Sequence, residues 1–135
     1  MNTHPYLRAY LAGIAVPTPM MLCGLTAYVI ARYVFNVSVP IERAAIFPLA
    51  VVPNAWGLWN VLYLAAHRHW PIGAHGALLP LLLIPAGYSL AKLLDIDFIT
   101  RNASFIWIAF PLAMVIYYLA WKYLVNFCNH VLGVA

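Results

Sequence analysis

The side chains best suited to binding a small ligand lie on one stripe of a long apolar segment. The stripe follows the helical spacing i, i+4, i+7 and i+11, and its members are Trp56, Asn60, Tyr63 and His67. Asn54 and Trp59 flank it. An amide without a hydrogen-bond partner is costly in apolar surroundings, so both Asn side chains must face protein or a cavity. We therefore expect a polar and aromatic ligand pocket formed by Asn54, Trp56, Trp59, Asn60 and Tyr63. The alternative is that the Asn side chains only join helices to one another.

Histidines form the second candidate site. His67, His69 and His75 fall within nine residues, around a short turn between two apolar segments. A neutral imidazole is a common metal ligand, so these three could hold a metal ion or a cofactor, although no Cys, Asp or Glu accompanies them. Two other interpretations stay open. Imidazoles change charge near about pH 6.5 and could sense acid, or the rings could simply favour the membrane interface. The nature of a cofactor is not predicted.

The chain offers little for catalysis. Its long apolar segments contain no carboxylate, and the sequence has neither a Gly-rich phosphate loop nor an arrangement typical of a Ser or Cys nucleophile. An enzyme is therefore the less favoured class. The formal net charge of +4 rests on only seven Lys and Arg residues, which argues against a nucleic-acid surface.

Long intervals without charge determine the class of protein. Four intervals between ions contain 23, 24, 23 and 20 residues, and a helix needs about 20 apolar residues to cross the hydrocarbon of a membrane. With 66% hydrophobic and 7% charged residues, a soluble domain of 135 residues could not bury this much apolar surface. We predict an all-α integral membrane protein with four transmembrane helices, at approximately 9–31, 44–67, 71–91 and 102–127. The residues after Asn126 should extend the last helix into the interface and fray.

The connections between the spans are short, so sequential helices should be antiparallel neighbours in a single domain, 1–135, with the architecture of an up-down four-helix bundle. A duplicated two-helix hairpin is a further possibility. An offset of 63 residues superposes 47–53 on 110–116 with five of seven residues identical, and it places Pro17 on Pro80. Halves related in this way would have the same orientation in the membrane, as in transporters built from parallel repeats. The alternative is chance similarity between apolar helices.

Four spans put both termini on the same side of a multi-pass membrane protein. That side also carries the turn at 67–71 and all five histidines, whereas the loops at 32–43 and 92–101 lie on the other. Three basic residues on the first side face four on the second, a difference too small to orient the protein by the distribution of positive charge. The sequence does not predict which side faces the cytoplasm.

Two functions fit these features. The first is a homo-oligomeric transporter or channel for a small solute, which the polar stripe and a Pro in every span favour. The second is an accessory or cofactor-holding subunit of a larger membrane complex, which the short loops and the histidines favour. The expected partners are the lipid bilayer and either further copies of the chain or other membrane subunits, with no nucleic acid.

Overall fold

The computed structural model describes residues 3–37, 42–95, 101 and 103–134, and all regular structure among them is helical. Four helical segments in these ranges are long and apolar enough to span a membrane, namely Pro5–Tyr33, Pro48–Ala66, Ile72–Leu93 and Ile106–Val131. The predicted all-helical class with four candidate membrane spans is therefore confirmed. Asn102, the first residue of the fourth predicted span, lies outside the described residues.

The first and third segments are each broken by a proline. In the first, α1 (Pro5–Ile14) and α2 (Pro17–Tyr33) are separated at Ala15 and Val16. In the third, α4 (Ile72–Ala77) and α5 (Leu79–Leu93) are separated at Leu78. Pro17 is the first residue of α2, and Pro80 is the second residue of α5. Proline has no N–H to donate, so the first turn of a helix tolerates it, and here each proline begins a new helix after a break.

The second segment is the single helix α3 (Glu42–Ala66), whereas the fourth changes its winding. It comprises η1 (Ala103–Phe105), α7 (Ile106–Ala120), the π-helix η2 (Trp121–Val125) and α8 (Asn126–Val131). Trp121 and Val125, at the two ends of η2, are both fully buried. The predicted extension of the last helix beyond Asn126 is present as α8, which packs against α1 and buries Asn129.

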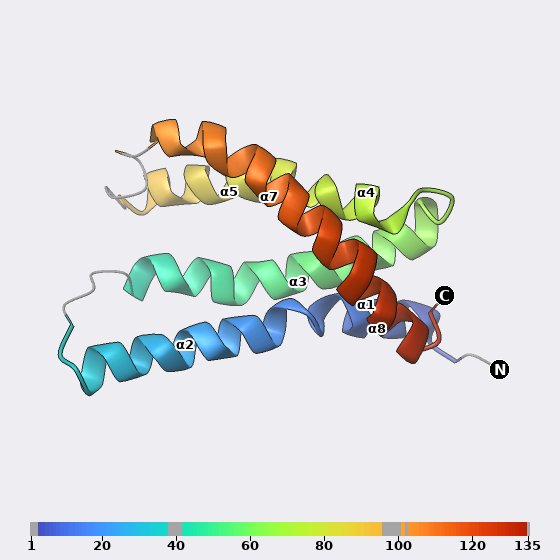
Figure 1. Cartoon of the computed structure of the whole chain (residues 1–135), viewed down its shortest axis with the longest axis horizontal. Helices are drawn as coiled ribbons and strands as arrows, with labels where there is room; N and C mark the ends of the chain where they lie inside the picture. Colours follow the sequence, from blue (N-terminus) through green and yellow to red (C-terminus); the bar gives the residue numbers. More distant parts are fainter. Residues whose placement is uncertain (1–2, 38–41, 96–100, 102, 135) are drawn as a thin grey trace.

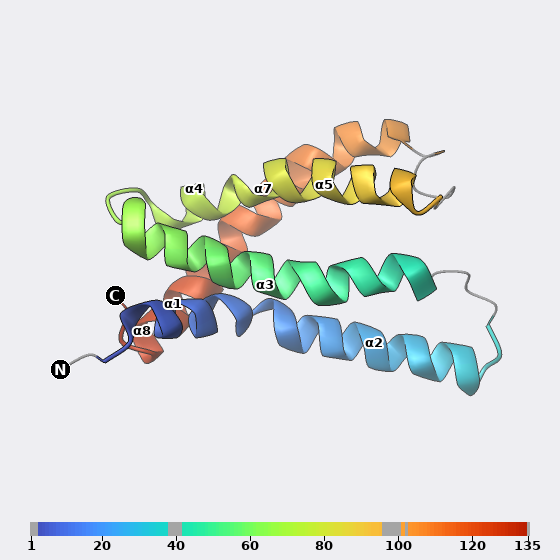
Figure 2. The same ribbon diagram turned by 180° about the vertical axis from the view of Figure 1, so that it is seen from behind.

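Both ends of the chain lie at the same end of the molecule as the turn between α3 and α4, which we call the terminal end (Figure 1). The C-terminal ends of α2 and α5 lie at the opposite end, the loop end. At the terminal end α1 packs on α3 and α8, and α4 packs on α7 and η2. Towards the loop end the α2–α3 pair diverges from the α5–α7 pair (Figure 2). The buried apolar core is correspondingly small and consists of Trp56, Leu79, Trp121 and Val125.

Glycines allow the closest helix contacts at the terminal end. A Cβ at Gly13 would lie 2.5 Å from the carbonyl oxygen of Trp56 and 2.8 Å from Cα of Gly57, so α1 and α3 meet backbone to backbone. A Cβ at Gly76 would lie 2.0 Å from Cγ of Trp121. Small residues let helices approach in this way in membranes, where van der Waals packing is a main source of helix association.

Candidate functional site

The predicted ligand-site residues lie on α3 but face three different environments. Asn60 is buried and bonds to α1 and α8, whereas Asn54 is exposed and accepts a bond from Tyr10 of α1. Trp59 and Tyr63 contact His75 of α4. Trp56 packs against the fourth segment. The structure thus places these side chains along α3, each against a different neighbour.

Asn60 is the centre of a buried amide pair. Its Nδ2 donates to Oδ1 of Asn129 at 2.7 Å and also lies 2.7 Å from the carbonyl oxygen of Ala9, while Nδ2 of Asn129 donates back to Oδ1 of Asn60 at 3.2 Å. Asn60 has no exposed surface, and Asn129 is 1% exposed. The reciprocal bonds join α3 to α8, and the bond to Ala9 adds α1. This arrangement holds helices together and leaves no free amide for a ligand.

Asn54 is more exposed, but its amide is also occupied. The hydroxyl of Tyr10 donates to its Oδ1, and its Nδ2 donates to the carbonyl oxygen of Ala50 at 2.7 Å. Six residues separate Asn54 from Asn60, so on a helix with 3.6 residues per turn they face different directions. Each therefore makes its own contact with the N-terminal helix.

His75 lies fully buried between α3 and the fourth segment and forms a short hydrogen-bonded chain. Its Nε2 is 2.9 Å from the carbonyl oxygen of Trp59, which can only accept, so Nε2 carries a proton and donates. In the neutral ring Nδ1 is then an acceptor, and it lies 3.2 Å from Nδ1 of His67, which must donate. The indole Nε1 of Trp59 returns a bond of 2.8 Å to the carbonyl oxygen of His75. Geometry alone thus assigns the tautomer of both rings.

Aromatic rings enclose this pair of histidines. Trp59 stacks on His75 with centroids 4.9 Å apart and an interplanar angle of 20°, and Trp121 meets His75 edge-on at 5.7 Å. On the other side, Trp70 stacks on His67 at 5.0 Å. The rings shield the chain of hydrogen bonds from solvent, which strengthens its electrostatics.

His69 does not join the other two predicted metal ligands. It is exposed and contacts the edge of Trp70, with centroids 6.2 Å apart. Among the described residues, no three His, Cys, Asp or Glu side chains come close enough together to hold a metal ion. Two of the three predicted ligands, His67 and His75, are therefore in direct contact, and the third points elsewhere.

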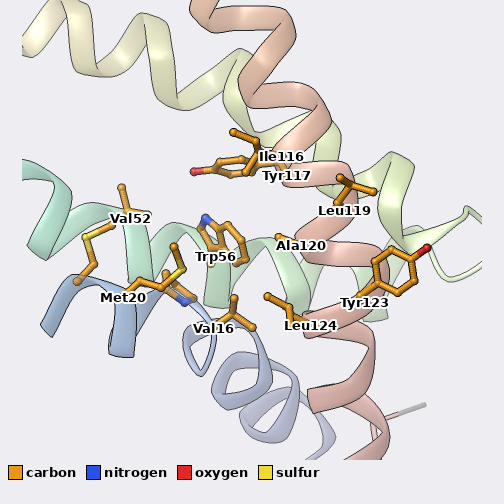
Figure 3. A pocket seen from close by; sticks show the side chains of 12 residues that line it. Val16, Met20, Val52, Trp56, Ile116, Tyr117, Leu119, Ala120, Tyr123 and Leu124 are labelled. Atoms are coloured by element: carbon orange, nitrogen blue, oxygen red, sulfur yellow. The ribbon is translucent and has the colours of Figure 1, made fainter. Parts of the chain in front are cut away.

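Trp56 forms one wall of an apolar pocket of about 500 Å³ (Figure 3). The ring packs at 4.9 Å from Tyr117 and at 5.5 Å from Trp121, measured between centroids. The other walls come from the start of α2 and from α7 and η2, and include Val16, Met20, Ile116, Ala120 and Leu124. The pocket therefore lies between α2, α3 and the fourth segment.

Three features of this region were missing from the sequence analysis. Asn129 lies beyond the predicted end of the fourth span, and the bond from Tyr10 to Asn54 was not predicted. The apolar pocket was not predicted either. The signal for Asn129 was present, since a second Asn in an otherwise apolar helix needs a partner just as Asn60 does. Comparison of the chain with protein-family models, with curated proteins and with solved structures found no match to any of them.

Proposed function

We propose that this chain transports a small solute across the membrane by means of two repeated helical hairpins. The first hairpin would comprise α1 to α3 and the second α4 to α8. The observation that carries the proposal is the position of the pocket, which lies between the two hairpins and halfway along the spans.

Equivalent features recur in the two hairpins at the offset of 63 residues. Gly13 and Gly76 both lie on a short first helix and make a close contact with the second helical segment of the same hairpin. Pro17 and Pro80 both follow a break and begin the next helix. Pro48 and Pro111 both lie inside the long second helix. A shared sequence, a shared break and a shared packing contact together support duplication more strongly than the sequence similarity does.

The pocket has the position expected of a transport site. Met20 lies near the middle of Pro5–Tyr33, Trp56 near the middle of Pro48–Ala66, and Ala120 near the middle of Ile106–Val131. Transporters built from repeats bind their substrates near the midplane, at the interface between repeats, beside discontinuous helices. Here the break between α1 and α2 and the π-helix η2 border the pocket, and π-helical turns are frequent at functional sites.

The two hairpins are held together differently at the two ends of the molecule. The Asn60–Asn129 pair and the chain through His75 close the terminal end, and the hairpins diverge towards the loop end. Movement of one hairpin against the other would exchange these arrangements. The breaks before Pro17 and Pro80 are natural hinges, since few backbone hydrogen bonds must change there.

Flux into liposomes tests the proposal. Purified protein should accelerate the entry of at least one member of a panel of small solutes. Val52→Phe should abolish that flux because it fills the pocket, whereas Val115→Phe, on the exposed face of α7 outside the pocket, should preserve it. Equal flux in empty liposomes, or flux untouched by Val52→Phe, would exclude transport through this pocket. Association into homo-oligomers stays a prediction, which the mass of the particle in detergent tests.

The second candidate function, a cofactor-holding subunit of a larger membrane complex, has support from the histidine pair. Two ligands of a tetrahedral metal ion such as zinc lie about 3.3 Å apart, close to the 3.2 Å between the Nδ1 atoms of His67 and His75. The bond from His75 Nε2 to the carbonyl of Trp59 is also the outer contact that orients many metal-bound imidazoles. Metal analysis of protein purified from native membrane tests this function, with His67→Gln expected to lose the metal and His69→Gln to keep it.

A further inference from the structure

The chemistry of the pocket restricts what can bind there. Its walls are almost entirely apolar, formed by Val16, Val52, Trp56, Ile116, Ala120 and Leu124. The polar groups among its lining residues are few, namely the indole N–H of Trp56, which is buried without a hydrogen-bond partner, and the hydroxyls of Tyr117 and Tyr123. A hydrophilic solute would lose its water here for very few hydrogen bonds, and each polar group left without a partner costs several kcal/mol. The occupant must therefore present hydrocarbon.

A second hollow extends the pocket along α2. This hollow, of about 180 Å³, shares Met20 and Met21 with the first and continues past Gly24 to Tyr28. From Val16 to Tyr28 the groove follows twelve residues of chain, or about 18 Å at the rise of a helix. One leaflet of a bilayer has a hydrocarbon depth of roughly 15 Å. The groove therefore has the length of a single lipid chain.

The same dimensions exclude a protein segment. A helix is at least about 10 Å wide, so a space of about 500 Å³ admits little more than one of its turns. A stable protein interface buries roughly 800 Å² on each partner, far more than one turn can supply. An acyl chain is narrow enough to follow the groove throughout. The flexible thioethers of Met20 and Met21, at the junction of the two hollows, adapt to such an irregular guest.

We propose that the groove between α2, α3 and α7 binds one acyl chain of a membrane phospholipid. This inference rests on the pocket that the proposed transport function uses, and it names an amphiphile with a hydrocarbon chain as the substrate class. The chain enters from the surrounding bilayer, because Met20 and Leu124 at the rim are exposed where lipid surrounds the helices.

Photocrosslinking tests the assignment. The probe is a phosphatidylcholine with a diazirine in the middle of one acyl chain, mixed into vesicles that contain the purified full-length protein. Lipid that merely surrounds the protein should label all exposed apolar side chains alike. A bound chain should label Met20, Met21 and Leu124 several-fold more than Leu112 and Val115, which are exposed on α7 outside the groove.

Variants distinguish a specific site from general contact. Val52→Phe should reduce labelling of Met20 several-fold, and Val115→Phe should leave it unchanged. Met20→Trp, at the exposed rim where a larger side chain is easily accommodated, should reduce labelling of Leu124 in the same way. Uniform labelling, or labelling that both groove variants leave unchanged, would overturn the proposal.

The experiments can refute lipid binding and transport independently of each other. Specific labelling of the groove without flux of any amphiphile would refute the transport function and retain the lipid site. Flux of a hydrophilic solute with uniform labelling would refute the lipid site and retain transport.

Discussion

Asn60 and Asn129, 69 residues apart in the chain, exchange hydrogen bonds through both of their side-chain amides. The pair is buried, and it ties the second helical segment to the last one at the terminal end. Because the same Nδ2 of Asn60 also lies within bonding distance of the carbonyl of Ala9, one side chain contributes to the contact of three segments.

Replacing either partner by Leu should destabilise the protein, because the remaining amide is left buried without a partner. A buried unsatisfied group costs about 1–3 kcal/mol, and bonds between membrane helices average about 0.6 kcal/mol. We expect Asn60→Leu and Asn129→Leu each to lower the free energy of unfolding by about 1–2 kcal/mol. The double variant should lose less free energy of unfolding than the two single variants lose together. Thermal and denaturant unfolding in detergent measure these values.

Asn54→Leu is the matched control for the amide pair. This substitution removes the bond from the hydroxyl of Tyr10 at an exposed position, where that hydroxyl can find another hydrogen-bond partner. The effect should be clearly smaller than that of Asn60→Leu. If the two variants were equally stable, or if the double variant were strictly additive, the amide pair would not be a coupled unit.

Alanine at the contact glycines should separate the helices. At Gly13 the added methyl meets backbone atoms of Trp56 and Gly57, which cannot rotate away, and at Gly76 it meets the buried indole of Trp121. Overpacking of this kind costs about 1–3 kcal/mol. Gly24 has nothing within 4 Å of the same position, so Gly24→Ala should be neutral or slightly stabilising because Ala favours helix. Equal melting temperatures for all three variants would contradict the close contacts.

Fusions to a reporter that is active on only one side of a membrane test the topology. Four spans place the segments after Arg32 and Arg101 on one side and those after Arg68 and Ala135 on the other. Reporter signals should therefore alternate along the chain, from Arg32 to Arg68, Arg101 and Ala135, with both termini on the same side. Matching signals after Arg32 and Arg68 would mean that α3 does not cross. A mixture of both signals at every position would indicate insertion in two orientations.

The sequence predicted the four helices well, because the length of an apolar interval is a local property. The partners of the polar side chains depend on packing and could not be predicted in the same way. Asn60 and Asn129 each need a partner in apolar surroundings, but the sequence does not indicate that they pair with each other. The stripe on α3 was expected to form a ligand pocket, with the joining of helices by Asn side chains as the alternative. Three different segments pack around α3, so adjacent members of the stripe meet different neighbours.

The histidine pair provides a prediction about acid. The 3.2 Å contact between His67 and His75 needs one unprotonated Nδ1 to accept the bond. Imidazoles gain protons near about pH 6.5, and two imidazolium rings at this distance would repel each other beside Arg68, the nearest charged residue in the chain. Stability that depends on this bond should therefore be lost on acidification, once both rings carry two protons. Unfolding temperatures measured from about pH 5 to 8 should show this loss.

Three variants identify its source. His67→Gln and His75→Gln should each flatten the dependence of unfolding temperature on pH, whereas His69→Gln should reproduce the wild-type curve because His69 is exposed and outside the pair. Added zinc then separates a plain hydrogen bond from a metal site. A metal ion needs both Nδ1 atoms unprotonated, so zinc should raise the unfolding temperature at pH 8 and lose its effect in acid if the pair binds it. If zinc has no effect on the unfolding temperature while the acid response remains, His67 and His75 are joined by a hydrogen bond and do not bind zinc. If the unfolding temperature of His67→Gln depended on pH as that of the wild type does, the bond between His67 and His75 would not be the source of the acid response.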